Sequence, residues 1–159
     1  MKNWIIFISV FVLSLTIGIT VLVLWKANAP FDKIEKQAIE VAIASEAITS
    51  STEAYVYNGN KPYVTVFGID ENGDEKAVFV PITLDEKSIQ QVYLKDGITK
   101  EQALSVLSDQ EVKEILHTKL GYEEPGAVWE ITYLNDSDKL NHVYILFVDG
   151  QWWKRILNL

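Results

Sequence analysis

One short segment occurs twice in this chain, and this repetition constrains the fold more than any other feature. The segment EKQAIEV at residues 35–41 recurs about 65 residues later as KEQALSV at residues 100–106, and strand-like runs follow each copy. Self-similarity at a fixed period is typical of one small structural unit used more than once. We therefore predict two related modules rather than one enzyme-sized domain.

The amino-terminal part of the chain is a long apolar run. From Trp4 to Trp25, 22 residues carry no charge, and a helix of that length spans ~33 Å, enough for the apolar core of a bilayer. We predict a membrane anchor and short linker over residues 1–29, with Trp4 and Trp25 at the interfaces. A signal peptide cleaved after Ala29 is the alternative, because Ala27-Asn28-Ala29 has the form of a cleavage site, but the apolar run is longer than such peptides use.

The rest of the chain is acidic and lacks cysteine. Residues 27–159 hold 12 basic and 22 acidic side chains, a net charge of −10. This charge disfavours nucleic acid and repels anionic lipid, so we expect contacts with proteins or cationic ligands. Without disulfides the domain depends on a packed core, which fits a bacterial surface protein. Because only three residues precede the span, we expect a single-pass protein with its N-terminus in the cytoplasm and its C-terminal domain outside the cell membrane.

The first predicted module covers residues 30–95. Its helix opens at Pro30 and Asp32 and carries apolar residues at helical spacing. Asn58-Gly59-Asn60 and Asn72-Gly73 are strong hairpin signals. The strands predicted around these turns are 54–57, 63–69, 77–82 and 89–94.

The second predicted module covers residues 96–159 and has the same order of elements. Thr99 with Gln102, and Ser108 with Glu111, form two capping boxes, so we predict a helix that breaks, restarts and ends at Gly121. The strands predicted after it are 128–134, 142–148 and 152–157. The fold class is therefore α+β, with each module a helix packed on an antiparallel sheet.

Two of the predicted strands are apolar at every position, namely residues 77–82 and 143–148. A sheet covered by a helix on one face should instead alternate apolar and polar residues. The second face is therefore covered by the sister module or by a partner protein. Since domains of about 65 residues keep little stability in reserve, we expect the two modules to pack together.

No pattern predicts a metal site or a cofactor. The acidic segment 70–75 has Glu75 and Pro81 where a calcium loop needs glycine and a carboxylate, so we interpret it as a hairpin turn, and 136–138 likewise. His117 and His142 lie on different elements, without the HExxH pattern of zinc enzymes.

Catalytic patterns are also missing from the sequence. Neither G-x-S-x-G nor S-x-x-K occurs. Glu123 and Glu124 could act as an acid and base pair in a glycosidase, but they resemble a solvated loop. We predict a protein that is not an enzyme and has no catalytic residues.

Adjacent tryptophans near the C-terminus are the best candidates for a binding surface. Neighbouring side chains on a strand point to opposite faces, so Trp152 and Trp153 cannot both enter one core. Exposed tryptophan anchors protein interfaces and stacks on sugars, whereas packing at the rim of the fold is the simpler alternative. We predict Trp152 and Trp153 as partner-binding residues. Trp129 and Tyr133 share one strand face and are expected in the core.

Several motifs together carry a family resemblance. WEITYL at residues 129–134, the apolar run 143–148 and the Asp149-Gly150 turn resemble a PepSY-type module. With the anchor, KPYVTV at 61–66 and GITKEQA at 97–103, nearly the whole chain resembles the YpmB or TseB-like proteins of Gram-positive bacteria.

This resemblance implies two tandem cystatin-like modules outside the cytoplasmic membrane. It further implies a non-enzymatic regulator of cell-wall elongation, and so of peptidoglycan synthesis, that acts through a class B penicillin-binding protein. The last turn, Asp149-Gly150-Gln151 followed by two tryptophans, departs from the Thr-Gly turn and aliphatic strand usual in PepSY-type modules. Two other functions stay open: a module that binds a cell-wall polymer, suggested by the tryptophans, and a peptidase inhibitor, since PepSY-type modules have been associated with inhibition.

Overall fold

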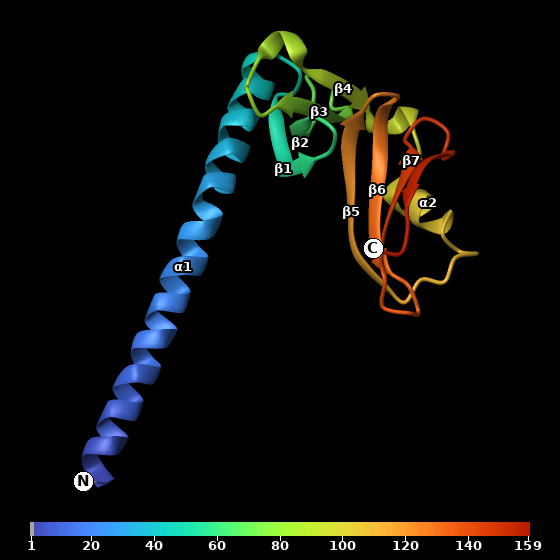
Figure 1. Cartoon of the computed structure of the whole chain (residues 1–159). Coiled ribbons are helices and arrows are strands. Elements are labelled where there is room, and N and C mark those ends of the chain that lie inside the picture. The colour runs from blue at the N-terminus through green and yellow to red at the C-terminus, as the bar shows by residue number, and fades with distance from the viewer. Residues whose placement is uncertain (1) are drawn as a thin grey trace. The chain divides into compact units, whose positions relative to one another are not determined.

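The computed structural model describes the backbone of residues 2–159 and the side chains of residues 3–23 and 32–159. Helix α1 (Lys2–Ala44) comes first, and eight strands and one further α-helix follow it (Figure 1). The chain divides into two compact units, Met1–Ile34 and Glu35–Leu159.

The first unit is helical and apolar. Asn3–Val23 is the one helical segment of the described residues that is long and apolar enough to cross a membrane. Its hydroxyl groups bond back to the helix, since Thr16 Oγ1 donates to Val12 O and Thr20 Oγ1 to Thr16 O, both at 2.9 Å. Trp4 is 74% exposed. The predicted second interface residue Trp25, and Ala29 of the alternative cleavage site, lie outside the described side chains.

The predicted helix start at Pro30 and Asp32 is wrong, because α1 continues unbroken from the apolar segment to Ala44. Proline weakens a helix by removing one hydrogen bond, but glycine is the usual residue at a helix end. No glycine occurs between Gly18 and Gly59. The chain therefore lacks the ordinary signal that would separate the two helical segments.

Four antiparallel strands form the N-terminal sheet, in the order β1-β2-β3-β4. The four predicted strands are present, with different ends: β1 (Ser50–Asn58), β2 (Pro62–Ile69), β3 (Glu75–Pro81) and β4 (Gln90–Tyr93). Short 3₁₀ turns, η1 (Glu86–Ser88) and η2 (Leu94–Asp96), flank β4. Gly73, at a φ of 82°, closes the predicted turn between β2 and β3 in a conformation that favours glycine.

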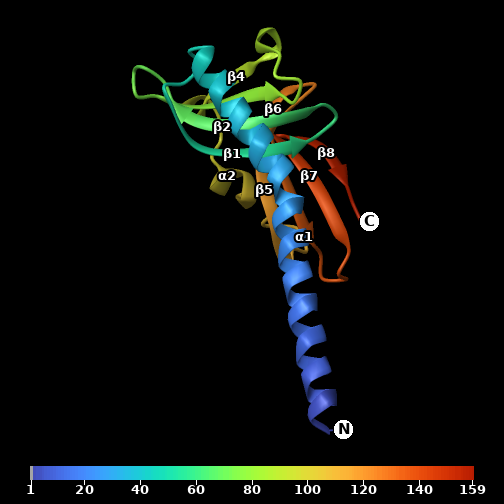
Figure 2. The same cartoon turned by 90° about the vertical axis from the view of Figure 1, so that its left-hand side faces the viewer.

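The last turns of α1 cover one face of the N-terminal sheet. Figure 2 shows the last turns of α1, which belong to the same unit as the sheets, crossing β1 and β2. Ala38 and Ala42 on this part of the helix are fully buried. Ile48 follows the helix and lies against Gly68, where a Cβ atom would come within 2.7 Å of the Ile48 side chain. The residues that share the face of Gly68 by register are the buried Val64, Val66, Val78 and Val80.

The second copy of the repeated segment forms helix α2 (Lys100–Ser105). The predicted first capping box is confirmed, since Gln102 N donates to Thr99 Oγ1 at 3.2 Å and Thr99 N to Gln102 Oε1 at 2.8 Å. Ala103 is fully buried, like Ala38 at the matching place in the first copy. The repeated segment therefore packs a helix onto a sheet in both modules.

The predicted continuation of this helix to Gly121 is wrong. Residues after the short helix form strand β5 (Glu114–Glu123), which pairs along its length with β6 (Gly126–Leu134). Ile115, Leu116 and Leu120 have helical spacing, but such a short apolar pattern does not distinguish helix from strand. Pairing with β6 satisfies the backbone of β5 and places Leu120 in the core, so tertiary structure overrides the local pattern.

Two further strands, β7 (Leu140–Leu146) and β8 (Trp152–Ile156), complete the C-terminal sheet in the order β5-β6-β7-β8. Both were predicted, and Gly150 closes the turn between them at a φ of 75°. Each module is thus a helix followed by four antiparallel strands. The predicted α+β class, with two tandem modules after an apolar helix, is confirmed.

The two sheets share one core, as predicted. Tyr63 and Phe79 of the N-terminal sheet contact Tyr122 of β5, with ring centroids 5.9 and 5.4 Å apart. Trp129 and Tyr133 are 7% and 3% exposed and belong to the same core. A hydrogen bond also links the two sheets, because Thr65 Oγ1 of β2 donates to the carbonyl oxygen of Leu120 on the edge strand β5 at 2.8 Å. Both modules therefore contribute to a single hydrophobic interior.

Candidate partner-binding face

The two tryptophans of β8 point to opposite sides of the C-terminal sheet. Trp152 lies opposite Ile145 and packs against the shared core, with the Arg155 guanidinium 5.1 Å from its ring centroid. Trp153 contacts Tyr144 edge to face, at 5.9 Å between centroids. Both side chains are half-buried. Only Trp153 lies on the side away from the core.

We call this side the outer face of the C-terminal sheet, the face opposite α2. Strand alternation defines it, because Trp129, Ile131 and Tyr133 of β6 point into the core with Ala103 of α2. The intervening residues therefore point outward. Its residues on the two central strands are Val128, Glu130, Thr132 and Leu134 on β6, and Leu140, His142, Tyr144 and Leu146 on β7.

The centre of the outer face is a polar network. Thr132 Oγ1 lies 2.9 Å from His117 Nε2 and 2.8 Å from His142 Nδ1, so one hydroxyl links two histidines on different strands. Glu130 Oε1 lies 3.4 Å from His142 Nδ1 and accepts a hydrogen bond from Tyr144 Oη at 3.3 Å. In the sequence, both histidines lie on different predicted elements, and no motif connects them. The period-two pattern of β6 was the available signal that Glu130 and Thr132 share a face.

Burial sets the proton affinities in this network. Burial lowers the pKa of His117 and so favours its neutral form. Burial, and after it the neighbouring Glu130 carboxylate, raises the pKa of Tyr144 to about 12. The two groups are therefore a neutral imidazole and a neutral phenol near pH 7.

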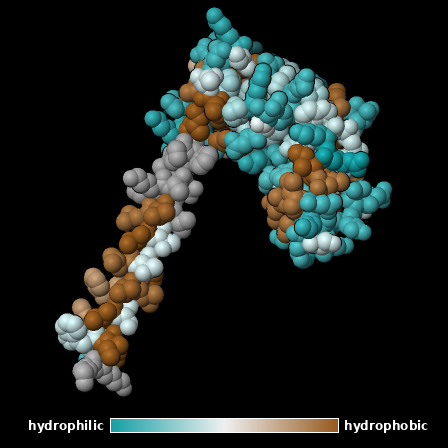
Figure 3. Space-filling view, viewed as in Figure 1, coloured by the Kyte–Doolittle hydropathy of each residue, from teal (hydrophilic) through white to brown (hydrophobic). Residues whose placement is uncertain are grey.

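One end of the outer face is apolar and accessible. Leu134 and Leu140 lie opposite each other in register and are half-buried. Leu116, which precedes the outward-facing His117 on the edge strand β5, is 46% exposed. Figure 3 shows a hydrophobic patch that interrupts the largely hydrophilic surface of this module. Exposed apolar surface rimmed by polar groups is typical of interaction sites.

The opposite end of the outer face is covered by the first module. Tyr57 of β1 is fully buried against Gly121, where a Cβ atom would lie 2.2 Å from its Cζ. Lys119 Nζ donates to Val56 O at 3.1 Å in the same region. The sister module, one of the two predicted covers for the second sheet face, therefore covers one end of it. Trp153 and the leucines at the other end stay accessible to a partner protein, the second alternative.

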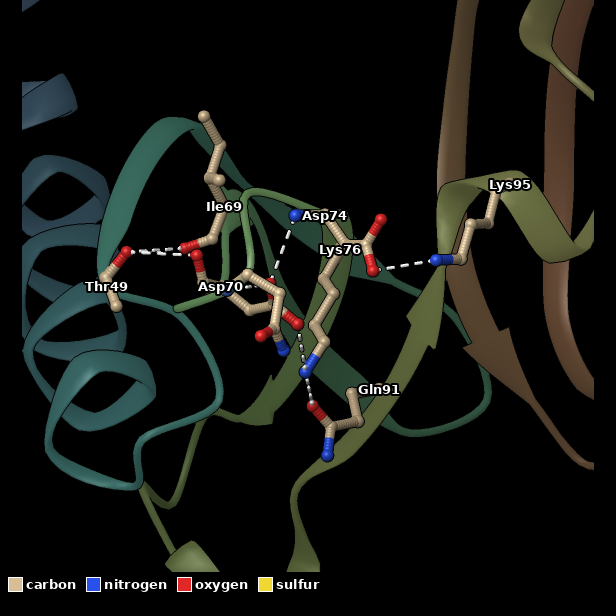
Figure 4. Close-up of polar contacts among 8 residues, drawn as sticks. Thr49, Ile69, Asp70, Asp74, Lys76, Gln91 and Lys95 are labelled. Carbon is tan, nitrogen blue, oxygen red and sulfur yellow. Dashed lines mark hydrogen bonds and ion pairs between the residues drawn. The ribbon is translucent and has the colours of Figure 1, made fainter.

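The acidic segments form turns, as predicted. Asp70 Oδ1 accepts from Asn72 N and Asp74 N at 2.9 and 3.0 Å, while Oδ2 lies 3.3 Å from Lys76 Nζ (Figure 4). Asp70 and Lys76 are both buried, at 6% and 8% exposure. In the other segment, Asn135 Oδ1 accepts the turn's amide hydrogens. The carboxylate of Asp70 therefore stabilises the β2–β3 turn through these contacts.

The other residues considered for chemistry do not converge. His117 and His142 meet only through Thr132. Within the described residues, no group of three or more His, Asp or Glu side chains is arranged to hold a metal ion. Glu123 is buried and bonded to Tyr57, whereas Glu124 beside it is exposed.

The fold and this face together define the class of the protein: two tandem α+β modules with a shared core and a half-exposed sheet face. A family model described as "Cell wall elongation regulator TseB-like domain" matches residues 37–81. The solved YpmB protein from Bacillus subtilis superposes with a TM-score of 0.65 and 26% identity, over 74% of this chain and 95% of that one.

A curated relative from Bacillus subtilis (strain 168), "Probable cell wall elongation regulator TseB", is 27% identical over 128 residues. The match covers 77% of this chain and 79% of the relative. Family model, relative and solved structure agree, so the resemblance of this chain to the YpmB/TseB-like family is confirmed.

Proposed function

We propose that this protein is a membrane-anchored regulator of cell-wall elongation that acts by binding a class B penicillin-binding protein and carries out no chemistry of its own. The name of the Bacillus subtilis relative supports the regulatory role. The outer face of the C-terminal sheet supports the mode of action, and it is the observation that carries the proposal. Trp153 and exposed apolar side chains lie on this face, and tryptophan is a typical anchor of protein interfaces.

The proposed interface is centred on Trp153. Large aromatic side chains with a polar surround contribute most of the binding energy in such interfaces. The Trp153 ring is positioned by Tyr144 and has Lys154 Nζ 6.0 Å from its centroid. Trp152 instead is half-buried and packs against the shared core on the other side of the sheet.

The test compares the two tryptophans in the full-length protein in its own membrane. A photo-crosslinking amino acid at position 153 should capture a penicillin-binding protein, identified by mass spectrometry. The same amino acid at the exposed Asp109, near α2 on the other side of the sheet, should not. Equal capture at both positions, or none at 153, would refute this interface.

Alanine substitutions separate binding from folding. Trp153→Ala should weaken partner capture with little change in melting temperature, because the ring packs on the half-buried Tyr144 outside the shared core. Trp152→Ala should cost about 2 kcal/mol or more in stability, since it leaves a cavity beside the core. The interface is disproved if Trp153→Ala destabilises the fold as much as Trp152→Ala and leaves capture intact.

A wall-polymer ligand is the second candidate function, favoured by the accessible Tyr144–Trp153 pair. Aromatic faces stack on sugar rings. Titration of the protein with soluble wall fragments decides between the two. Saturable binding that Trp153→Ala abolishes would favour the polymer, whereas no binding would leave the protein partner.

The proposed location is the cell membrane, with the N-terminus in the cytoplasm and the domain outside. The apolar segment Asn3–Val23 and the net charge of −10 on residues 27–159 support it. An alkaline phosphatase fused after Leu159 should be active in living cells, since that enzyme needs an oxidising exterior. Activity of only a cytoplasmic reporter at that position would reverse the orientation.

A further inference from the structure

A second feature, separate from the outer-face patch, is a pocket of about 470 Å³ beside the β1–β2 and β5–β6 turns. Its lining residues are Asn60, Lys61, Tyr63, Tyr122, Glu123 and Glu124. Because these residues come from both modules, the pocket exists only when the two sheets are packed together.

Glu123 is a buried carboxylate that uses one of its two oxygens. The side chain is on a residue only 8% exposed. Its Oε1 accepts from Tyr57 Oη at 3.0 Å and from Asn60 N at 3.1 Å. Gly59 makes room for it, since a Cβ there would lie 2.0 Å from Oε1.

The other oxygen of Glu123, Oε2, has no hydrogen-bond partner among the described residues. Among the described residues, Thr118 Oγ1 is the one side-chain atom that is both fully buried and without a hydrogen-bond partner. Because Oε2 has no partner either, it is not fully buried. Glu123 lines the pocket, so Oε2 is accessible from that side. Because Glu123 is nearly buried, a cation that binds this oxygen would pair with it more strongly than at the open surface.

Aromatic rings form the wall next to this carboxylate. Tyr63 and Tyr122 pack edge to face at 5.9 Å between centroids. Ring faces attract cations, and the attraction increases when water is excluded. Two carboxylates outnumber the single cation at the pocket, Lys61, whose exposed side chain forms no ion pair within the described residues.

We propose that this pocket binds a primary alkylammonium group, which pairs with Glu123 Oε2 and lies against the rings of Tyr63 and Tyr122. A neutral sugar would use the rings but leave the carboxylate without a counter-charge. The acidic domain as a whole would attract the same ligand by long-range electrostatics. The ammonium belongs either to a lysine side chain of a polypeptide or to a small free amine. The proposal does not depend on the protein partner proposed above.

The test is an NMR titration of the full chain in nanodiscs, selectively labelled with ¹⁵N-asparagine. The Asn60 amide donates to Glu123 and therefore reports on its carboxylate. Nα-acetyl-lysine methylamide and n-butylamine should each shift this signal saturably. The Nε-acetylated lysine probe, which lacks the positive charge, should not. Equal shifts with the acetylated probe would overturn the proposal with no variant needed.

Two matched variants locate the binding oxygen. Glu123→Gln keeps an acceptor for Tyr57 and Asn60 but removes the charge, so affinity should fall about tenfold or more. Glu71→Gln removes an exposed carboxylate in the β2–β3 turn and should leave affinity unchanged. Unchanged affinity in Glu123→Gln would refute the assignment. Tighter binding of the lysine probe than of butylamine would identify a polypeptide source, and equal binding a small amine.

Discussion

Gly121 shows how one residue position determines the contact between the modules. Its missing side chain leaves the space that the Tyr57 ring occupies, 2.2 Å from where a Cβ would be. We expect Gly121→Ala to lower the free energy of unfolding by about 1–3 kcal/mol, because the fully buried ring cannot move without losing packing and its hydrogen bond to Glu123. Urea denaturation measures this cost.

The matched control repeats the substitution in a Tyr57→Leu background, where the smaller side chain should reduce the cost of Gly121→Ala. An equal cost in both backgrounds would mean that glycine is needed at position 121 for the backbone conformation and not for the space that the Tyr57 ring occupies.

Asp70 makes stability depend on pH. Burial alone would raise its pKa, but the backbone hydrogen bonds from Asp74 and Asn72 and the interaction with Lys76 together hold it below the ordinary value of 3.8. The native state therefore favours the ionised carboxylate. The stability it contributes is fully present above pH 4 or so and is lost as the pH falls through the lowered pKa.

Asp70→Asn should accordingly lower the melting temperature at pH 7, and the difference from wild type should shrink below about pH 4. Asp74→Asn is the control, because its ion pair with Lys95 is exposed and such pairs contribute little. A difference between Asp70→Asn and wild type that stays constant down to pH 2 would contradict this account.

At the scale of elements, α2 and β5 mark where local signals succeed and fail. Two capping boxes were predicted in succession, and only the one at Thr99 forms. Thr99→Ala should therefore cost about 1 kcal/mol of stability, the usual effect of losing an N-cap. Thermal unfolding monitored by circular dichroism is the measurement.

Ser108→Ala provides the internal comparison, since Ser108 is exposed and precedes no helix. We expect it to change stability by less than about 0.5 kcal/mol. If Ser108→Ala were the more harmful substitution, the helix would have to extend beyond Ser105.

At the scale of the whole molecule, the two modules share a core and should unfold together. The core includes Phe79 and Ala77 of the first sheet with Ile131 and Ile145 of the second. Neither module alone retains this interior. We propose that the predicted modules 30–95 and 96–159 are structural repeats within one cooperative unit.

Calorimetry of the full chain in detergent should show one transition, with equal calorimetric and van't Hoff enthalpies. Residues 96–159 expressed alone should give the narrow amide spectrum of an unfolded chain. Two separated transitions, or a folded second module, would show that the modules are independent.

The features that the sequence alone determined are those that depend on nearby residues. The apolar run 3–23, the glycine turns at Gly73 and Gly150, the Thr99 cap and the two buried alanines of the repeat follow from hydrophobicity, backbone preference and short spacing. These signals were enough for the α+β class and most strands, because each is decided within a few residues.

Tertiary structure alone decided what depends on distant residues. Strand β5 exists because β6 pairs with it, although its own pattern favours a helix. Tyr57 meets Glu123 across a separation of 66 residues, and Thr132 joins two histidines from neighbouring strands. The choice of Trp153 over Trp152 as the outward ring depends on which face the shared core covers. Such contacts form between surfaces that exist only after the two sheets have packed.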